Sequence, residues 1–263
     1  MARGQPCFAQ SQALSWKARK LGGVAVETKA LSWDQRTGAA TQLLRLPPEF
    51  WRAGPAAFAV ACEFYVLQGS FSFGDVTYAR DSYAYLPAGL GWSGWHSRDG
   101  AVVLVMSDGG VEIGVPRDID ADDAVVHASA SQTAWSAVSP SRARSAATYF
   151  AKALRGDEDS SAQTFLCAAL PHVTPRPAAG GSREATAEIF CLSGNFQLED
   201  LGNGGPGTYA WTRGSNWAPP RTETGYSLLV RMQRPRLAAH VGERIAAAAP
   251  RTDDGPILLS EGW

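Results

Sequence analysis

The sequence has few cysteines and few histidines, four of each in 263 residues. The cysteines stand alone at positions 7, 62, 167 and 191, and no two of them form a C-x-x-C pair. This spacing excludes the common zinc-knuckle and dithiol redox motifs. The start of the chain has no apolar run of signal-peptide length, so no oxidising compartment is indicated. We therefore expect four free thiols in a cytoplasmic protein.

Long hydrophobic runs and an excess of charge are also missing. The longest apolar stretches, such as residues 101–106, have the length of a strand and are too short to span a bilayer as a helix. Lys and Arg number 24 against 25 Asp and Glu, so no positive excess is available to neutralise a phosphate backbone. We expect neither a membrane nor a nucleic acid as partner.

Within the two parts of the chain that resemble each other, no segment carries a sustained helical stripe of apolar residues. Short segments rich in Val, Phe, Tyr and Trp are separated instead by Gly, Pro, Asp or Asn, which is typical of strands joined by turns. Gly74-Asp75 and residues 204–207 (GGPG) have the composition of hairpin turns, since glycine readily adopts positive φ. The sequence predicts an all-β protein built from antiparallel barrels or jelly rolls.

Several of these blocks recur in the same order in the second part of the chain. Residues 62–69 (CEFYVLQG) correspond to residues 187–194 (AEIFCLSG), and residues 81–85 (DSYAY) correspond to residues 207–211 (GTYAW). A repeat of this kind predicts two copies of one structural unit.

The repeat sets the predicted domain boundaries. We expect an N-terminal domain over residues 1–114, a linker over 115–147, a C-terminal domain over 148–235 and a tail over 236–263. The linker is rich in Asp, Ala, Ser and Pro, and a short helix is expected near residues 130–138.

The repeated blocks resemble motifs of the cupin superfamily. Residues 63–69 (EFYVLQG), residues 81–89 (DSYAYLPAG) and their second copies carry the resemblance, which covers about residues 22–107 and 148–232. Within that superfamily the sequence resembles ChrR-type bicupins and uncharacterised bacterial bicupins that are similar to acetylacetone dioxygenase. The resemblance implies two tandem double-stranded β-barrels, or jelly rolls, and allows a homodimer formed through exposed sheet edges.

Cupins that bind a metal hold it with three histidines and one glutamate, and this sequence departs from that pattern at every ligand position. In the first copy Cys62 stands at the glutamate position, Trp92 stands at the position of the last histidine, and residues 55–58 contain no ligand. In the second copy Ala187 and Ala218 occupy the matching positions. We therefore expect no metal and no other cofactor.

Glu63 and Glu188 lie one residue beyond the glutamate ligand position in the two copies. Successive side chains of a strand point to opposite faces, so neither carboxylate should point into its barrel. We expect both to be surface or rim carboxylates paired with a neighbouring arginine.

The same alternation predicts the walls of a pocket inside the first barrel. Val60, Cys62 and Phe64 should point inward, with Trp92 and Trp95 nearby, and these walls suit an apolar or aromatic ligand. Arg45 is a candidate for binding a carboxylate or enolate of the substrate. An ion pair between Arg45 and Glu63 on the outside of the barrel is the alternative.

Three residues are candidates for chemistry in this pocket. His96 could act as a general acid or base, Tyr85 could donate a hydrogen bond, and Cys62 could be a nucleophile if a cation lowered its pKa. The structural alternatives are a rim histidine, aromatic packing and a buried thiol that behaves as a small hydrophobe.

These features together favour a metal-independent enzyme of the isomerase, cyclase, dehydratase or lyase type that acts on a small, largely apolar molecule in the N-terminal barrel. A non-catalytic ligand-binding or regulatory protein is the alternative. A metal-dependent dioxygenase is less favoured, because its ligands would have to be recruited from Glu63, His96 and Cys62.

Overall fold

The computed structural model of the chain describes residues 7–120, 122, 124–138, 149–156, 162–173, 186–199, 201–213 and 219–233. Nearly all the regular structure in this part is β-strand, which confirms the all-β prediction; the 3-10 helix η1 (Ser11–Ala13) is the exception. No helix among the described residues has the length and hydropathy needed to cross a membrane. The predicted tail, residues 236–263, lies outside the described residues.

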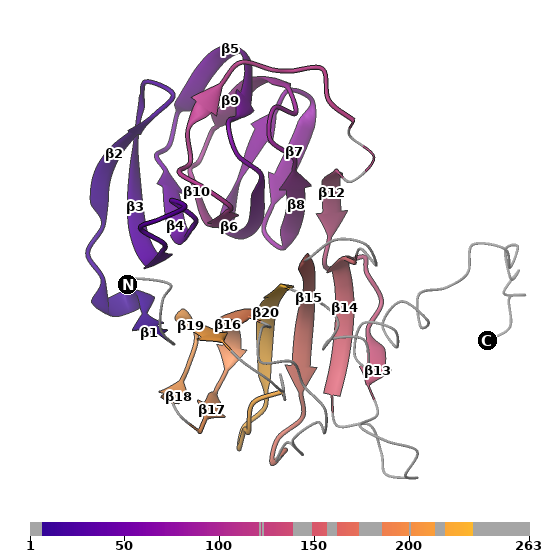
Figure 1. Ribbon diagram of the computed structural model, residues 1–263. Helices are drawn as coiled ribbons and strands as arrows, with labels where there is room; N and C mark the ends of the chain where they lie inside the picture. The colour runs from indigo at the N-terminus through magenta and orange to yellow at the C-terminus, as the bar shows by residue number, and fades with distance from the viewer. Residues whose placement is uncertain are drawn as a thin grey trace, which may run out of the picture.

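The first half of the chain forms an 11-stranded sheet that folds into a barrel-like body (Figure 1). Its central strands follow the order β11-β5-β9-β6-β10-β4-β3-β2, with β7 and β8 paired to β6 and β12 paired to β8. The strands of this sheet are β2 (Lys17–Leu21), β3 (Val24–Trp33), β4 (Ala40–Leu46), β5 (Phe50–Phe58), β6 (Cys62–Phe73), β7 (Val76–Ala79), β8 (Ser82–Leu86), β9 (Trp92–Ser97), β10 (Ala101–Ser107), β11 (Ile113–Gly114) and β12 (Val125–Ser129).

The second half forms a seven-stranded antiparallel sheet in the order β1-β19-β16-β20-β15-β14-β13 and a separate two-stranded hairpin, β17-β18. These strands are β1 (Cys7–Gln10), β13 (Ser136–Val138), β14 (Tyr149–Arg155), β15 (Ala162–Ala169), β16 (Thr186–Gly194), β17 (Phe196–Leu198), β18 (Gly202–Gly204), β19 (Thr208–Arg213) and β20 (Tyr226–Gln233).

Strand pairing crosses the predicted domain boundaries. The N-terminal strand β1 pairs with β19 in the sheet of the second half, where Phe8 lies opposite Ala210. The segment predicted as a linker contributes β12 to the first sheet and β13 to the second. The short helix expected near residues 130–138 is wrong: a turn at residues 130–132 leads into β13, whose three residues pair with β14. Pairing with β14 gives the backbone N–H and C=O groups of β13 hydrogen-bond partners, whereas a short isolated helix leaves many of its backbone groups unpaired at its ends.

Two glycines close the repeated strand blocks and allow neighbouring strands to approach closely. Gly69 has φ of 71° and Gly194 has φ of 75°, both in the left-handed region that favours glycine. A Cβ atom at Gly69 would collide with the carbonyl oxygen of Gly100, and one at Gly194 would collide with that of Gly225. The two halves therefore require glycine at matching positions for the same steric reason.

The two halves pack against each other through the faces of their sheets that point away from the barrel interiors (Figure 1). This interface has an apolar cluster with members from both halves. Its buried residues include Leu43, Tyr65 and Leu104 from the first half, and Leu166 and Leu229 from the second. Each sheet is therefore buried on both faces over the area of contact.

A charged network lies within this apolar interface. The Glu63 carboxylate accepts hydrogen bonds from Arg231 Nε (2.9 Å), Arg155 Nη1 (3.1 Å), the Tyr83 hydroxyl (2.8 Å) and the Thr164 hydroxyl (2.5 Å). Glu63 and Tyr83 come from the first half, whereas the two arginines and Thr164 come from the second. Two guanidinium groups and two hydroxyl groups thus donate to one buried carboxylate, and three of these four donors come from the other side of the interface.

Glu188 occupies the matching position in the second half. Its carboxylate accepts hydrogen bonds from the Tyr209 hydroxyl (2.8 Å), from the Thr41 hydroxyl of the first half and from Arg231 Nη1 (3.3 Å). Because the single proton of the Tyr209 hydroxyl goes to Glu188, the hydroxyl of Ser32, 2.7 Å away, donates to Tyr209.

Arg231 connects these two carboxylates with a third. Its Nη2 donates to Asp108 Oδ1 at 2.7 Å, so one guanidinium contacts Glu63, Glu188 and Asp108. Burial alone would lower the pKa of Arg231, but the three negative charges raise it well above its usual value. Arg231 is therefore positively charged near neutral pH.

The prediction that Glu63 and Glu188 are surface or rim carboxylates is wrong. They are 1% and 3% exposed, although the alternation of the strand does point them away from the barrel interior. The outer face is buried because the other half of the chain covers it. The expected pairing with arginine is present, and for Glu63 both arginines come from the other half of the chain.

We predict that Arg231→Met lowers the free energy of unfolding by about 3–5 kcal/mol, because it leaves buried carboxylates without their shared cation. Met106 stands at the corresponding position of the first half, so a methionine fits this strand face. Urea unfolding followed by circular dichroism measures the change. The control Arg45→Met removes an ion pair with Glu27 that is about half exposed and should cost about 0–1 kcal/mol. Equal effects of the two substitutions would contradict this account.

Candidate functional site

The interior of the first barrel, where the ligand pocket was expected, is filled by side chains. Cys62, Phe64 and Trp95 point inward as the strand alternation predicts, and all three belong to the buried core of this half. Val60 packs partly buried against the same core. The space that remains is a cavity of about 20 Å³, which holds about one water molecule. The interior therefore has no room for an organic ligand.

Aromatic rings fill this space. The Trp95 ring lies edge-on to Phe50 at 4.8 Å between centroids, and Phe64 lies edge-on to Tyr78 at 4.9 Å. Phe73 stacks on Trp92 at 4.4 Å with an interplanar angle of 22°. Rings in such geometries contribute stability beyond the area they bury, so this cluster acts as the core of the barrel.

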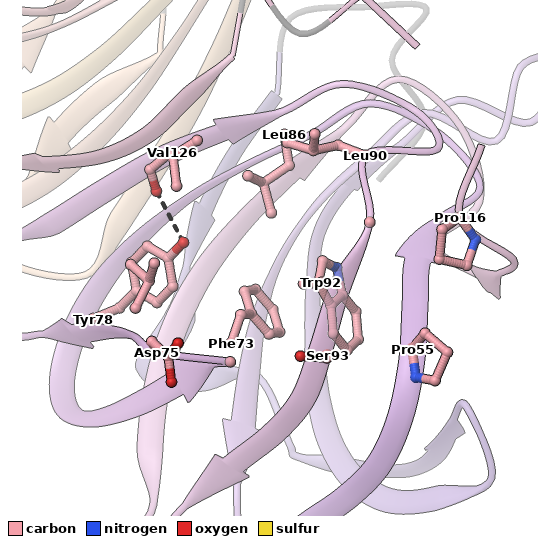
Figure 2. A pocket seen from close by; sticks show the side chains of 13 residues that line it. Pro55, Phe73, Asp75, Tyr78, Leu86, Leu90, Trp92, Ser93, Pro116 and Val126 are labelled. Carbon is pink, nitrogen blue, oxygen red and sulfur yellow. Dashed lines mark hydrogen bonds between the residues drawn. The ribbon is translucent and has the colours of Figure 1, made fainter. Parts of the chain in front are cut away.

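A larger cavity lies at the mouth of the barrel, next to Trp92 (Figure 2). Its volume is about 530 Å³. Its walls are mainly apolar and come from β5, from the β6-β7 hairpin, from β8, from the segment leading into β9, and from the β11-β12 connection with the start of β12. The described residues that line it are Pro55, Phe73, Gly74, Asp75, Val76, Tyr78, Leu86, Leu90, Gly91, Trp92, Ser93, Pro116 and Val126.

Trp92 forms one wall of this cavity, and the stacked Phe73 lies beside it (Figure 2). On the opposite side, the Tyr78 hydroxyl donates to the carbonyl oxygen of Val126 at 2.9 Å, which ties β7 to β12. The hydroxyl of Tyr78 is therefore occupied, and its ring faces the cavity as an apolar surface. Burial also raises the pKa of Tyr78 to about 12, so it stays protonated near neutral pH.

The structure does not bring His96, Tyr85 and Cys62 together. His96 follows the inward-pointing Trp95 on β9 and lies on the outer face, where its ring is 5.6 Å from the exposed ring of Trp51. Tyr85 lies at the interface between the halves, where the Arg155 guanidinium covers its ring at 3.3 Å. Cys62 belongs to the core. None of the three lines the mouth cavity.

Cys62 does not have the environment of a nucleophile. Burial, and then the negative charge of Asp108, raises the pKa of its thiol to about 12, and the cation of Arg231 opposes this shift only in part. The thiol is therefore neutral near pH 7 and packs as a small apolar group.

Arg45 also lies away from the cavity. It pairs with Glu27 at 2.9 Å on the outer face of β4, and its guanidinium lies over the ring of Trp16 at 3.9 Å. The alternative pairing of Arg45 with Glu63 is not formed, because Arg155 and Arg231 from the second half occupy that carboxylate.

Several residues around the cavity were not identified from the sequence as site residues. The sequence predicts Asp75 only as a turn residue and gives no indication that Tyr78 and Val126 line a site. Beside Val126, the imidazole Nε2 of His127 lies 3.2 Å from the Ser82 hydroxyl, so a hydrogen-bonded pair stands next to this wall. The position of Asp75 in a hairpin between two aromatic strands indicates that it lies at a barrel rim. The position of Val126 could not be predicted, because no sequence pattern indicates that β12 pairs with β8.

The residues present do not fit the metal site of a cupin. Cys62, at the glutamate position, is a buried neutral thiol, and Trp92 stacks on Phe73 where the last histidine would stand. In the second half Ala187 packs in the core, whereas Ala218 lies outside the described residues. Within the described ranges, no three His, Cys, Asp or Glu side chains are grouped so that they could hold a metal ion.

We predict that the buried thiols react slowly while the protein is folded. Burial raises the pKa values of Cys62, Cys167 and Cys191 to about 12 each, above the ordinary value of 9.0, so very little thiolate is present at pH 8. This shift contributes stability that is fully present below about pH 9 and is lost as the pH rises toward 12. Thiol titration with and without denaturant measures how fast the thiols react in the folded and in the unfolded protein. Rapid modification of Cys62 in the folded protein would contradict its assignment as a buried, neutral thiol.

Comparison with solved structures identifies the fold. A proposed dioxygenase from Nostoc punctiforme superposes with a TM-score of 0.72 and 21% identity, covering 88% of this chain and 83% of that one. The Escherichia coli protein Ylba gives a TM-score of 0.58 at 14% identity over 89% and 93% of the two chains. Oxalate decarboxylase from Bacillus subtilis gives 0.52 at 12% identity over 86% and 76%. At these identities the similarity shows the cupin fold alone.

Comparison of the sequence with curated proteins found no match. A family model described as a domain of unknown function, DUF4437, matches residues 9–235 and thus spans both halves of the structure. The chain belongs to the DUF4437 family.

Proposed function

We propose that this protein binds a small, largely apolar organic molecule in the mouth cavity of the first half, without a metal ion. The observation that carries the proposal is the cavity itself, with about 530 Å³ of space next to the stacked Trp92 and Phe73 rings. Small-molecule sites commonly have this size and a mainly apolar lining with few polar groups. The proposed site lies at the mouth of the barrel and not in its interior.

The proposal of a metal-independent site rests on the ligand positions. Thiol, indole and methyl side chains stand where the metal-binding cupins have carboxylate and imidazole, and a thiol with a raised pKa is a poor ligand. The similar structures include a proposed dioxygenase and oxalate decarboxylase, which makes a metal-dependent activity the competing explanation.

A second candidate function is a metal-independent enzyme of the isomerase, cyclase, dehydratase or lyase type. The observation that favours it is the position of titratable groups beside the cavity: Asp75 lies in its wall, and the imidazole of the Ser82–His127 pair lies 5.6 Å from the ring of Tyr78, which also lines it. A carboxylate and an imidazole can transfer protons near neutral pH. The binding function requires fewer groups, and none of the catalytic residues predicted from the sequence, His96, Tyr85 and Cys62, lines this cavity.

We predict that metal analysis of the purified protein finds well below one transition-metal ion per chain. Inductively coupled plasma mass spectrometry after expression in medium supplemented with Fe, Mn, Zn, Ni and Cu measures this directly. One tightly bound ion per chain would contradict the proposal and favour the dioxygenase explanation.

We predict that aromatic fragments bind in a way that depends on Trp92. In an NMR fragment screen of the full chain, Trp92→Ala should weaken the fragments that bind by about tenfold or more, because it removes the indole wall of the cavity. The control Trp51→Ala removes an indole that is 62% exposed on the outer face and should leave binding unchanged. If the two substitutions have equal effects, the ligand does not bind in the mouth cavity.

A further inference from the structure

One charged side chain lines the mouth cavity among the described residues. Asp75 lies in the turn between β6 and β7 and faces the same space as Phe73 and Trp92 (Figure 2). Its carboxylate forms no ion pair and no hydrogen bond with any other residue in the described part of the chain. An apolar cavity with a single uncompensated carboxylate has a net negative charge.

Two arginines lie near residues of the cavity wall, and neither forms an ion pair with Asp75. The Arg52 guanidinium lies 5.7 Å from the centroid of the Trp92 ring and donates to the carbonyl oxygen of Ala53 at 3.5 Å. The Arg117 side chain packs over Gly89. Neither arginine is among the residues that line the cavity.

We infer that the cavity selects apolar molecules that carry a protonated amine. This inference rests on the proposed binding function and names its ligand class: an aromatic or aliphatic body beside Trp92 and Phe73, with an ammonium group toward Asp75. The apolar walls bind the body through burial of surface, and the carboxylate attracts the cation and repels an anion. A carboxylic acid of the same shape is the ligand that this cavity disfavours.

The size of the selectivity follows from the exposure of Asp75. The side chain is exposed at the rim, so its attraction for a cation is screened by water and by salt. We therefore expect the amine to bind about three- to tenfold more tightly than a neutral molecule of the same shape, and the preference to decrease at high ionic strength.

Three probes with one phenyl body test the inference: 2-phenylethylamine, 2-phenylethanol and phenylacetate. Dissociation constants are measured at pH 7 by NMR titration of the full chain. We expect the order amine, alcohol, carboxylate from tightest to weakest. Asp75→Asn should bring the amine to the affinity of the alcohol, whereas the control Asp99→Asn, which changes an exposed acid outside the cavity, should leave the order unchanged.

The outcomes separate this inference from the proposed function. If all three probes bind with equal affinity and Trp92→Ala weakens them all, the site is correct and the selectivity for amines is wrong. If no probe binds, or if binding is insensitive to Trp92→Ala, the proposed function is wrong as well. A preference for phenylacetate that survives Asp75→Asn would also overturn the inference.

Discussion

The buried network around Arg231 is the interaction on which the arrangement of the two halves depends. One guanidinium is shared by Glu63 from the first half, Glu188 from the second and Asp108 at the edge of the interface. Charged groups this deeply buried are tolerated when their partners satisfy them geometrically, and the partners here come from both halves. The network therefore ties the relative position of the two sheets to a small set of hydrogen bonds.

The network has nearly equivalent contacts in the two halves. Glu63 accepts from Tyr83 of its own half and from Thr164 of the other, and Glu188 accepts from Tyr209 and from Thr41 in the same way. Arg231 breaks the equivalence, because Met106 stands at its counterpart. These matched contacts accord with the repeat in the sequence; duplication of one ancestral unit and the bicupin subtype remain predictions.

Much of the fold could be predicted from local sequence patterns. Strand alternation correctly placed Cys62 and Phe64 inside the barrel and Glu63 outside it, because that alternation is a local property of extended backbone. The burial of Glu63 could not be predicted, since it depends on which surface covers the outer face. The exchange of β1 into the second sheet is likewise a long-range pairing that no local pattern encodes.

The site was harder to predict, because it depends on how completely side chains fill the barrel. Inward-pointing residues were correctly identified, but whether Trp95 and Phe64 leave space depends on how the rings of four strands, β5, β6, β7 and β9, pack together. Trp92 and Trp95 have the same apparent role in the sequence, yet Trp95 is 1% exposed in the core and Trp92 borders the cavity. Asp75 belongs to the site only because its hairpin lies at the mouth of the barrel.

The central claim, that the ligand binds at the mouth of the first half without a metal, is tested most directly by a crystal structure. Crystals grown with 2-phenylethylamine, with anomalous data collected for transition metals, would show both features at once. The account predicts ligand density between Trp92 and Asp75 and no anomalous peak in the barrel interior. A metal peak beside Cys62, or a ligand bound away from Trp92, would contradict it.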